Sequence, residues 1–223
     1  VLDVIQHTVG PQIAGDVVDL SMVIPAGQDS HSFEPTPADI RLIQNADLLI
    51  CNGGTMEQWV TQVLGSLDAP DLKVITMMDY VDVVQEEIVE GMEDSGDDHG
   101  HDHAHHDEED GDHADHDHDT EDHDHADDDH AYEIEYDEHI WTSPVNAMKI
   151  TQVIADTLEE MDPADAAVFR ANEADYLGKL KNLDQEFRDV VDGADLDLIV
   201  MADKFPLRYF ADTYGLRYRA AFS

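Results

Sequence analysis

The residues best suited to chemistry in this sequence are histidines gathered in one acidic stretch. Eleven of the 14 histidines lie between His99 and His130, interleaved with aspartate and glutamate as in HGHDHAHHDEEDGDHADHDHD. Neutral imidazole and carboxylate both coordinate borderline divalent ions such as zinc, nickel and copper. Because ordering such a flexible tract costs entropy, we expect its sites to be many, weak and exchangeable. A solvated acidic linker with incidental histidines is the alternative interpretation.

The charge pattern separates this tract from the rest of the chain. Of the 53 acidic residues, 26 lie between Glu86 and Glu138, and neither lysine nor arginine occurs between Lys73 and Lys149. The other 27 acidic residues face only 11 basic ones, so the remainder is also strongly anionic. This balance argues against nucleic acid and acidic lipid as partners and favours cations.

Cysteine content and hydropathy narrow the class further. Cys51 is the single cysteine, so we expect neither an intramolecular disulfide nor a cysteine-rich zinc knuckle. The sequence has no run of 18 or more apolar residues and no signal peptide before Val1. The chain as given is therefore expected to be soluble and not to span a membrane.

Three histidines lie outside the tract. His7 falls off the apolar face of the first predicted helix, which favours a surface role. His31 lies in a loop punctuated by glycine and proline, and His139 follows the acidic tract. A lone loop histidine is more often structural than a ligand, so the importance of these two depends on the elements that position them.

Apolar spacing predicts helices that alternate with strands in the first half of the chain. This order is typical of a parallel sheet with helices on both faces, where ligands bind at the carboxyl ends of the strands. The loops Pro25–His31 and Asn52–Gly54 would lie at that edge. The predicted elements are a helix ended by Gly15, a strand from Val18 to Ile24, a helix opened by a capping box at Thr36 and Asp39, a strand from Leu48 to Cys51, a helix from Met56 to Val63, and a strand from Lys73 to Met77.

The second half begins with helices and returns to strands. One helix starts at Pro144, and a second, unusually long one runs from Pro163 to about Val191, as expected of a strut between two lobes. A strand–helix–strand unit alone cannot bury both faces of a sheet, so we expect a truncated C-terminal lobe. The N-terminus also begins with a helix where a central strand is expected. The last predicted elements are a strand from Leu196 to Met201, a helix from Phe205 to Tyr214, and a strand from Arg217 to Phe222.

Several stretches resemble one protein family. GQDSHSFEPTPADIRLIQNADLLICNGGTMEQW is similar to the N-terminal lobe of the zinc and manganese solute-binding proteins of ABC transporters, and EHIWTSPVNAMKI resembles their second histidine motif. MDPADAAVFRANEADYLGKLKNLDQEF resembles the long helix that joins their lobes, and FPLRYFADTYGL resembles the segment that carries their third ligand. The zinc branch typically has a His-rich acidic loop where this chain has its tract.

The resemblance implies an α/β fold of two doubly wound, Rossmann-like lobes joined by a long rigid helix. Residues 1–162 would form the N-terminal metal-binding lobe, with a disordered insert at about 93–130. Residues 163–192 would form the linking helix, and residues 193–223 would begin the C-terminal lobe.

Carried over by position, the resemblance implies that His31 and His139 bind the metal from the N-terminal lobe. The third position departs from the pattern, because ADKFP stands where zinc-branch proteins commonly have a histidine. Asp203 or Lys204 occupies that place, depending on a one-residue shift. A protonated lysine cannot donate to a metal, so Asp203 is the predicted third ligand. The fourth, acidic ligand of the family would lie beyond Ser223.

The function that the resemblance implies is high-affinity capture of zinc outside the cytoplasm and its delivery to an ABC-type import permease. We expect a monomer, either periplasmic or anchored as a lipoprotein on the outer face of the cytoplasmic membrane. Two imidazoles favour Zn²⁺, whereas the carboxylate of Asp203 favours Mn²⁺, which prefers oxygen ligands. A closed site of this kind captures metal and does not catalyse.

Three alternatives remain open. A manganese-binding protein or adhesin would use the same lobes, and a zinc buffer would act through the His-rich tract alone. A metallohydrolase would need an open zinc position and Glu34 or Glu138 as a base, and no HExxH, GxSxG or Walker motif supports it. For the tract itself, the hypothesis is that it collects ions and passes them to the folded site.

Overall fold

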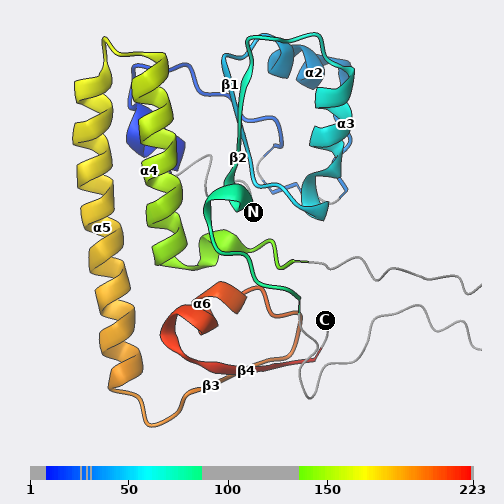
Figure 1. The fold of residues 1–223 in the computed structure, drawn as a ribbon. Coiled ribbons are helices and arrows are strands. Elements are labelled where there is room, and N and C mark those ends of the chain that lie inside the picture. Colours follow the sequence, from blue (N-terminus) through cyan, green and yellow to red (C-terminus); the bar gives the residue numbers. More distant parts are fainter. Residues whose placement is uncertain (1–8, 26, 29, 31, 87–135, 222–223) are drawn as a thin grey trace, which may run out of the picture.

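A computed structural model of the chain describes residues 9–25, 27–28, 30, 32–86 and 136–221. Its frame is a pair of long helices, α4 (Pro144–Met161) and α5 (Ala166–Asp192), which pack side by side. Figure 1 shows one strand-containing unit near the end where α4 passes into α5 and another near the far end of α5. The long helix predicted from residue 163 is confirmed, although it begins at Ala166 because residues 163–165 form a turn.

The first unit contains a pair of short parallel strands. β1 (Leu48–Cys51) pairs with β2 (Lys73–Thr76) in the register Leu48 to Lys73, as the apolar runs predicted. The connection between them consists of η1 (Thr55–Glu57) and α3 (Gln58–Ser66), and η2 (Met77–Tyr80) follows β2. Two parallel strands joined through a helix form the βαβ arrangement of an α/β protein.

The capping box predicted before the first of these strands is confirmed. It opens α2 (Pro37–Gln44), where the Thr36 hydroxyl accepts hydrogen bonds from Ala38 N–H and Asp39 N–H. In return, the Asp39 carboxylate accepts from Thr36 N–H at 2.8 Å. Proline at the first helical position lacks the N–H that would otherwise be unpaired there, so the segment starts a helix at this residue.

The strand predicted from Val18 to Ile24 is wrong. Residues 9–14 are helical and Gly15 ends this helix at φ +58, but residues 18–24 form no strand. Val18 packs against the main apolar cluster and Val23 against the cluster beneath β1. An alternating pattern makes a strand only if its apolar residues face one surface, and here they are divided between two.

The second unit repeats the parallel arrangement with one helix. β3 (Leu198–Met201) pairs with β4 (Arg217–Ala220), and α6 (Arg208–Tyr214) connects them. Gly215 adopts the left-handed conformation (φ +65) that ends α6. The three elements predicted for this region are confirmed with shorter bounds, and the end predicted at Phe222 lies outside the described residues. The α/β class predicted from sequence is therefore confirmed.

The main core joins the two units. Its buried side chains come from the N-terminal helix, β2, η2, η3 (Ile140–Thr142), α4 and α5, and it includes Tyr209 of α6. Two smaller clusters lie beneath β1 and α3 and inside the β3–α6–β4 unit. Among the helices that the structure describes, none is both long and apolar enough to cross a membrane.

Candidate metal centre

His139 lies directly before η3, and its imidazole is held from one side. Its Nδ1 is 3.1 Å from Asp137 Oδ1, and the same oxygen accepts the His139 backbone N–H at 2.8 Å. The Trp141 ring makes an edge contact, with ring centroids 5.4 Å apart. A carboxylate beside Nδ1 favours the tautomer protonated there, which leaves the lone pair of Nε2 free for a metal.

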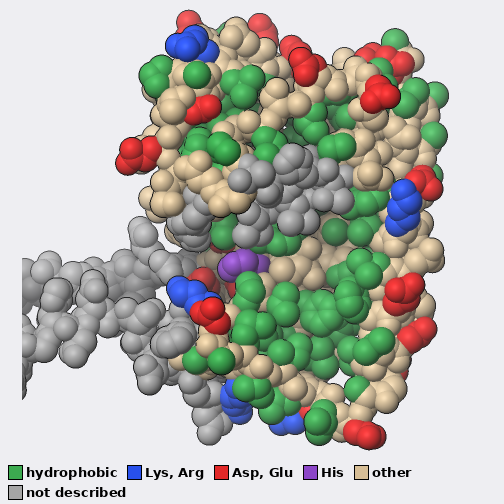
Figure 2. Space-filling view, turned by 180° about the vertical axis from the view of Figure 1, so that it is seen from behind, with side chains coloured by type: hydrophobic (Ala, Val, Ile, Leu, Met, Phe, Trp, Pro, Cys, Tyr) green, Lys and Arg blue, Asp and Glu red, His purple; other side chains and the backbone are tan. Residues whose placement is uncertain are grey.

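The imidazole remains accessible on the other side. The His139 side chain is 29% exposed, whereas that of Asp137 is only 11% exposed. Figure 2 shows histidine reaching the surface beside a broad patch of hydrophobic side chains, and His139 is the one histidine among the described residues. A ligand that is oriented from behind and open in front is the arrangement that metal binding requires.

Asp137 is itself fixed through its backbone. Its N–H donates to the carbonyl of Val84 at 2.9 Å, and its carbonyl accepts the hydroxyl of Tyr209 at 2.5 Å. Both backbone groups of this nearly buried residue are therefore paired, which keeps its carboxylate in place beside the histidine.

The next residue, Glu138, is bound to the loop that follows β1. Its carboxylate accepts hydrogen bonds from Thr55 N–H, from the Thr55 hydroxyl at 2.8 Å and from Met56 N–H at 2.7 Å. The amide of Asn52 donates to the Glu138 carbonyl at 3.0 Å. With 6% exposure and these partners, Glu138 anchors the histidine segment to β1 and is not free to act as a base.

Two glycines allow this close approach. Gly53 and Gly54 have φ values of +94 and +78, a region that favours glycine. A Cβ atom on Gly54 would overlap the Glu138 carboxylate, and one on Gly53 would overlap the Thr76 side chain. The predicted loop Asn52–Gly54 does lie at the carboxyl end of β1, and it packs against the residues that precede His139.

A second buried carboxylate closes this loop. Glu57 is 3% exposed, and its Oε2 accepts Asn52 N–H at 2.6 Å and Gly53 N–H at 3.0 Å. Burial raises the pKa of Glu57 to about 7, the two N–H groups oppose this, and nearby Glu138 adds to it. The neighbouring Cys51 is also buried, which raises its pKa to about 11 and keeps it a neutral thiol rather than a metal-binding thiolate.

Asp203 lies in a different environment. It comes two residues after β3, is exposed, and accepts the N–H of Lys204 on its own Oδ1 at 2.8 Å. Lys204 is exposed as well. Within the described ranges, no three His, Cys, Asp or Glu side chains form a group that could hold a metal. The structure therefore does not combine His139 and Asp203 with a third described donor.

The other residues singled out from sequence lie outside the described residues. These are His7, His31 and the histidines of the tract. The two described ends next to the tract nevertheless meet, because Gln85 and Tyr136 form an antiparallel bridge. Tyr136 is three residues before His139, so the chain enters and leaves the tract close to the candidate metal ligand.

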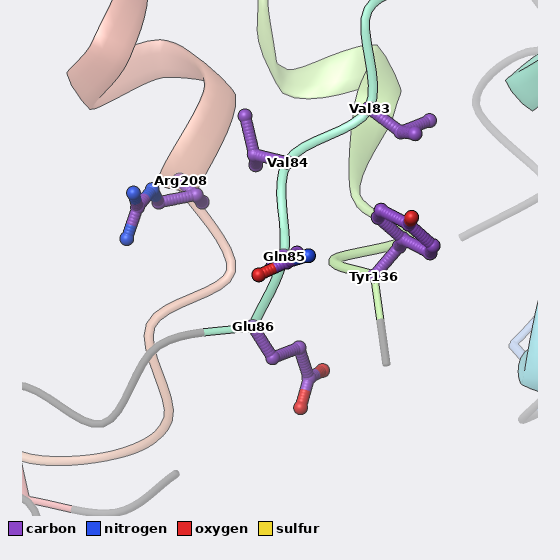
Figure 3. Close-up of a pocket in the computed structure, with 6 residues that line it drawn as sticks. All are labelled: Val83, Val84, Gln85, Glu86, Tyr136 and Arg208. Atoms are coloured by element: carbon purple, nitrogen blue, oxygen red, sulfur yellow. The ribbon is translucent and has the colours of Figure 1, made fainter. Parts of the chain in front are cut away.

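A shallow hollow lies beside the Gln85–Tyr136 bridge. Figure 3 shows the segment from Val83 to Glu86 between Tyr136 on one side and Arg208 of α6 on the other. The guanidinium of Arg208 bonds to Asp212 and to the hydroxyl of Tyr218 within its own unit. The hollow thus lies where the described residues on both sides of the tract meet the C-terminal unit.

Sequence reasoning missed Asp137 and Tyr209. A carboxylate two residues before a candidate histidine ligand could have identified Asp137, because metal-binding histidines usually donate their second N–H to such a group. Tyr209 is 72 residues from Asp137 in the chain, and no local pattern points to their contact.

Comparison with known proteins identifies a family through a family model and through related sequences. A family model described as "Zinc-uptake complex component A periplasmic" matches residues 4–223. The zinc-binding lipoprotein AdcA of Streptococcus pneumoniae is 31% identical over 207 residues, which cover 92% of this chain and 35% of that protein. The manganese-binding lipoprotein MntA of Halalkalibacterium halodurans is 24% identical over 204 residues, covering 91% of this chain and 53% of that protein.

Solved structures share the fold. The Zn(II)-bound ZnuA-like domain of S. pneumoniae AdcA matches with a TM-score of 0.67 at 24% identity, over 95% of this chain and 61% of that one. The metal-dependent lipoprotein YcdH of Bacillus subtilis matches with a TM-score of 0.70 at 24% identity, over 96% of this chain and 63% of that one.

These matches extend through both units and the helices between them. The chain spans about a third of the length of the AdcA proteins that it matches, and about two thirds of the solved domains. Because the family model covers nearly every residue, the chain belongs to the family of the periplasmic component A of the zinc-uptake complex.

Proposed function

We propose that this protein captures zinc with high affinity outside the cytoplasm and delivers it to the import permease of an ABC transporter. The observation that carries this proposal is the contact between His139 Nδ1 and Asp137 Oδ1 at 3.1 Å. It orients a half-exposed imidazole with Nε2 as the free donor, in a chain whose family is one of zinc-uptake components.

The proposed ligands are His31, His139 and Asp203. Two neutral imidazoles and one carboxylate give a site of low net charge that suits a divalent ion. Asp203 is preferred to Lys204 because an ammonium group has no lone pair to donate. The proposed units are residues 1–162 for the N-terminal lobe, 163–192 for the linking helix and 193–223 for the start of the C-terminal lobe.

Zinc is the preferred metal because imidazole binds zinc more strongly than it binds manganese. The names of the AdcA relatives support this choice, since they are zinc-binding proteins. Manganese is the second candidate, and one observation favours it: the relative MntA is named as manganese-binding. The relatives named as lipoproteins, together with the periplasmic family description, support a location outside the cytoplasm.

The His-rich tract is proposed to collect ions and pass them to the folded site, in a protein that acts as a monomer. The antiparallel bridge between Gln85 and Tyr136 supports this role, since it joins the described residues on the two sides of the tract, and Tyr136 lies three residues before His139. Tethered donors raise the local concentration of metal at a neighbouring site. Deleting residues 93–130 should slow zinc loading at scarce zinc while the affinity of the folded site is kept. An unchanged loading rate would contradict this role.

The family is one of metal-binding transport components and not a family of enzymes. Catalysis is further disfavoured by Glu138, since three donors from Thr55 and Met56 occupy its carboxylate. Hydrolysis of esters or peptides that depends on added zinc would revive the enzyme alternative.

The proposal is tested by metal competition and by transport. The full-length protein should take zinc from a chromophoric chelator with higher affinity than it takes manganese, and His139→Ala should weaken the tightest site by at least about 100-fold, since it removes one ligand outright. The same variant should fail to restore growth at scarce zinc in a bacterial strain that lacks its own zinc-binding component. Equal affinity for both metals, or full growth with His139→Ala, would reject the proposal.

A further inference from the structure

A tyrosine hydroxyl from the C-terminal unit is inserted into the backbone pairing that holds Asp137. Residues opposite each other at a hydrogen-bonded position of an antiparallel pair exchange two N–H···O bonds. Val84 and Asp137 occupy such a position next to the Gln85–Tyr136 bridge, and they form only one of the two bonds, from Asp137 N–H to the Val84 carbonyl at 2.9 Å.

The second bond runs through Tyr209. Its hydroxyl accepts the Val84 N–H at 3.3 Å and donates to the Asp137 carbonyl at 2.5 Å. One oxygen thus satisfies both backbone groups that would otherwise bond directly. Without it, these groups must either remain unpaired or close on each other, and closing would move Asp137 away from its present position.

Tyr209 is well placed to act as a rigid support. It is 4% exposed, and although it belongs to α6 it packs in the main core with residues of the N-terminal lobe. Burial raises its pKa to about 12, so the phenol remains a donor at physiological pH.

A second contact fixes the same turn of α6. The hydroxyls of Ser143 and Thr213 are 2.8 Å apart, and the Thr213 hydroxyl also donates to the Tyr209 carbonyl at 2.6 Å. Ser143 directly follows η3, and η3 packs against α6. The residues before and after His139 are therefore both tied to this helix.

We propose that Tyr209 is a positioning residue for the metal site: its hydroxyl holds Asp137, Asp137 orients the His139 imidazole, and metal affinity at His139 therefore depends on the docking of α6. The inference rests on the proposed function, because it takes His139 as a metal ligand. It makes α6 the element through which the C-terminal unit acts on a ligand of the N-terminal lobe, and through which bound metal stabilises the contact between them.

The test compares two variants that each lose one tyrosine hydroxyl from α6. Tyr209→Phe removes the bridge, whereas Tyr214→Phe removes a hydroxyl bonded to Asp184 of α5 at 3.0 Å and has no link to Asp137. In full-length protein titrated with zinc against a chelator, Tyr209→Phe should weaken the tightest site about 10-fold, as loss of an orienting partner typically does. Tyr214→Phe should remain within about twofold of the unchanged protein.

A second readout follows the ring itself. Nitrogen-15 spectra of the metal-free protein, with His139 assigned by comparison with His139→Gln, should show the Nδ1-protonated tautomer. Tyr209→Phe should shift the signals towards a mixture of tautomers, and Tyr214→Phe should leave them unchanged. This readout does not require that His139 bind zinc, so it separates failure of the inference from failure of the proposed metal site.

The outcomes are distinct. Equal affinity and equal ring signals in Tyr209→Phe and Tyr214→Phe would overturn the positioning role. If His139→Ala leaves zinc affinity unchanged, the metal-site proposal falls instead. If Tyr209→Phe is too unstable to titrate, Thr213→Val replaces it, because this variant loosens the same turn of α6. Thr213→Val should then shift the His139 signals in the same direction. The absence of a shift would overturn the inference.

Discussion

The two segments predicted to supply metal ligands differ in how the fold holds them. Asp137 and Glu138, which precede His139, are buried, and they are bonded to the loop after β1, to Val84 and to α6. The segment around Asp203 is exposed, and the carboxylate of Asp203 bonds to the adjacent backbone N–H. One predicted ligand is thus positioned before metal arrives, whereas the other predicted ligand has little to fix its direction.

The difference indicates a division of roles. A pre-oriented imidazole loses little entropy on binding and is suited to first capture. An exposed carboxylate on the other unit must become ordered on binding, so it is suited to report that metal has arrived. The following four predictions would break or sharpen this contrast, and they run from the largest expected effect to the smallest.

Filling the space at Gly54 that the Glu138 carboxylate occupies should have the largest effect on stability. Gly54→Ala would place a Cβ atom into the Glu138 carboxylate at a positive φ, so we expect the free energy of unfolding to fall by about 2–4 kcal/mol. Urea denaturation measures this. The control Gly178→Ala, on an exposed helical position with open space around it, should instead gain about 0.5–1 kcal/mol. If Gly54→Ala left the free energy of unfolding unchanged, the close packing of Glu138 against residue 54 would not be needed for stability.

The buried carboxylate of Glu57, which closes the loop after β1, should make the stability of the protein depend on pH. Burial raises the pKa of Glu57 from 4.5 to about 7, so the folded state binds more protons than the unfolded state between these values. The contribution of Glu57 to the free energy of unfolding is therefore fully present below about pH 4.5. It is lost as the pH rises through about 7, and the loss amounts to at most about 3 kcal/mol.

The variant Glu57→Gln tests this sign. It should flatten the decline in unfolding free energy of the metal-free protein between pH 5 and pH 8. Glu160→Gln is the matched control: Glu160 is exposed and its ion pair with Lys73 lowers its pKa, so it should leave the slope in this range unchanged. If the unfolding free energy of Glu57→Gln still declines with pH in this range, the proton that the folded state binds must belong to another group.

Replacing the orienting carboxylate should weaken metal binding without unfolding the protein. Asp137→Asn keeps the size of the side chain but removes the charge that favours Nδ1–H, so we expect zinc affinity to fall about 10- to 100-fold. Chelator competition measures the loss. Asp82→Asn, which removes an exposed carboxylate paired with Lys149, should have no effect on affinity. Equal behaviour of the two variants would show that Asp137 does not orient His139.

The smallest effect is expected on the exposed side. Asp203→Ala should weaken zinc binding by no more than about 10-fold, or about 1.4 kcal/mol, because an exposed carboxylate gains less than it would in a buried site. Lys204→Ala should leave affinity within about twofold, which decides the one-residue register. A larger loss from Lys204→Ala than from Asp203→Ala would reverse the assignment.

Much of this architecture could be predicted from local patterns. The apolar run at Leu48–Cys51 and all but the last residue of the run Lys73–Met77 form strands, and the capping box at Thr36 opens a helix, because each depends on neighbouring residues. The strand from Val18 to Ile24 was wrong because its apolar residues are divided between two clusters, which only the assembled fold reveals.

The site was predicted less completely than the fold. The resemblance to known binding proteins pointed to His139. The structure adds Asp137, which lies two residues before it, and Tyr209, which reaches Asp137 from a distant segment of the chain. The Tyr209 contact follows from how α6 docks into the main core, and neither residue type nor local spacing encodes it.

The most direct test is whether His31 and His139 bind one ion. Zinc affinity of the tightest site is measured in full-length protein, in His31→Ala, in His139→Ala and in the double variant. If both imidazoles share one ion, each single variant should lose at least about 100-fold and the double variant little more, since the site is already broken. A single variant that keeps the original affinity would show that the two histidines do not share this ion and would contradict the account.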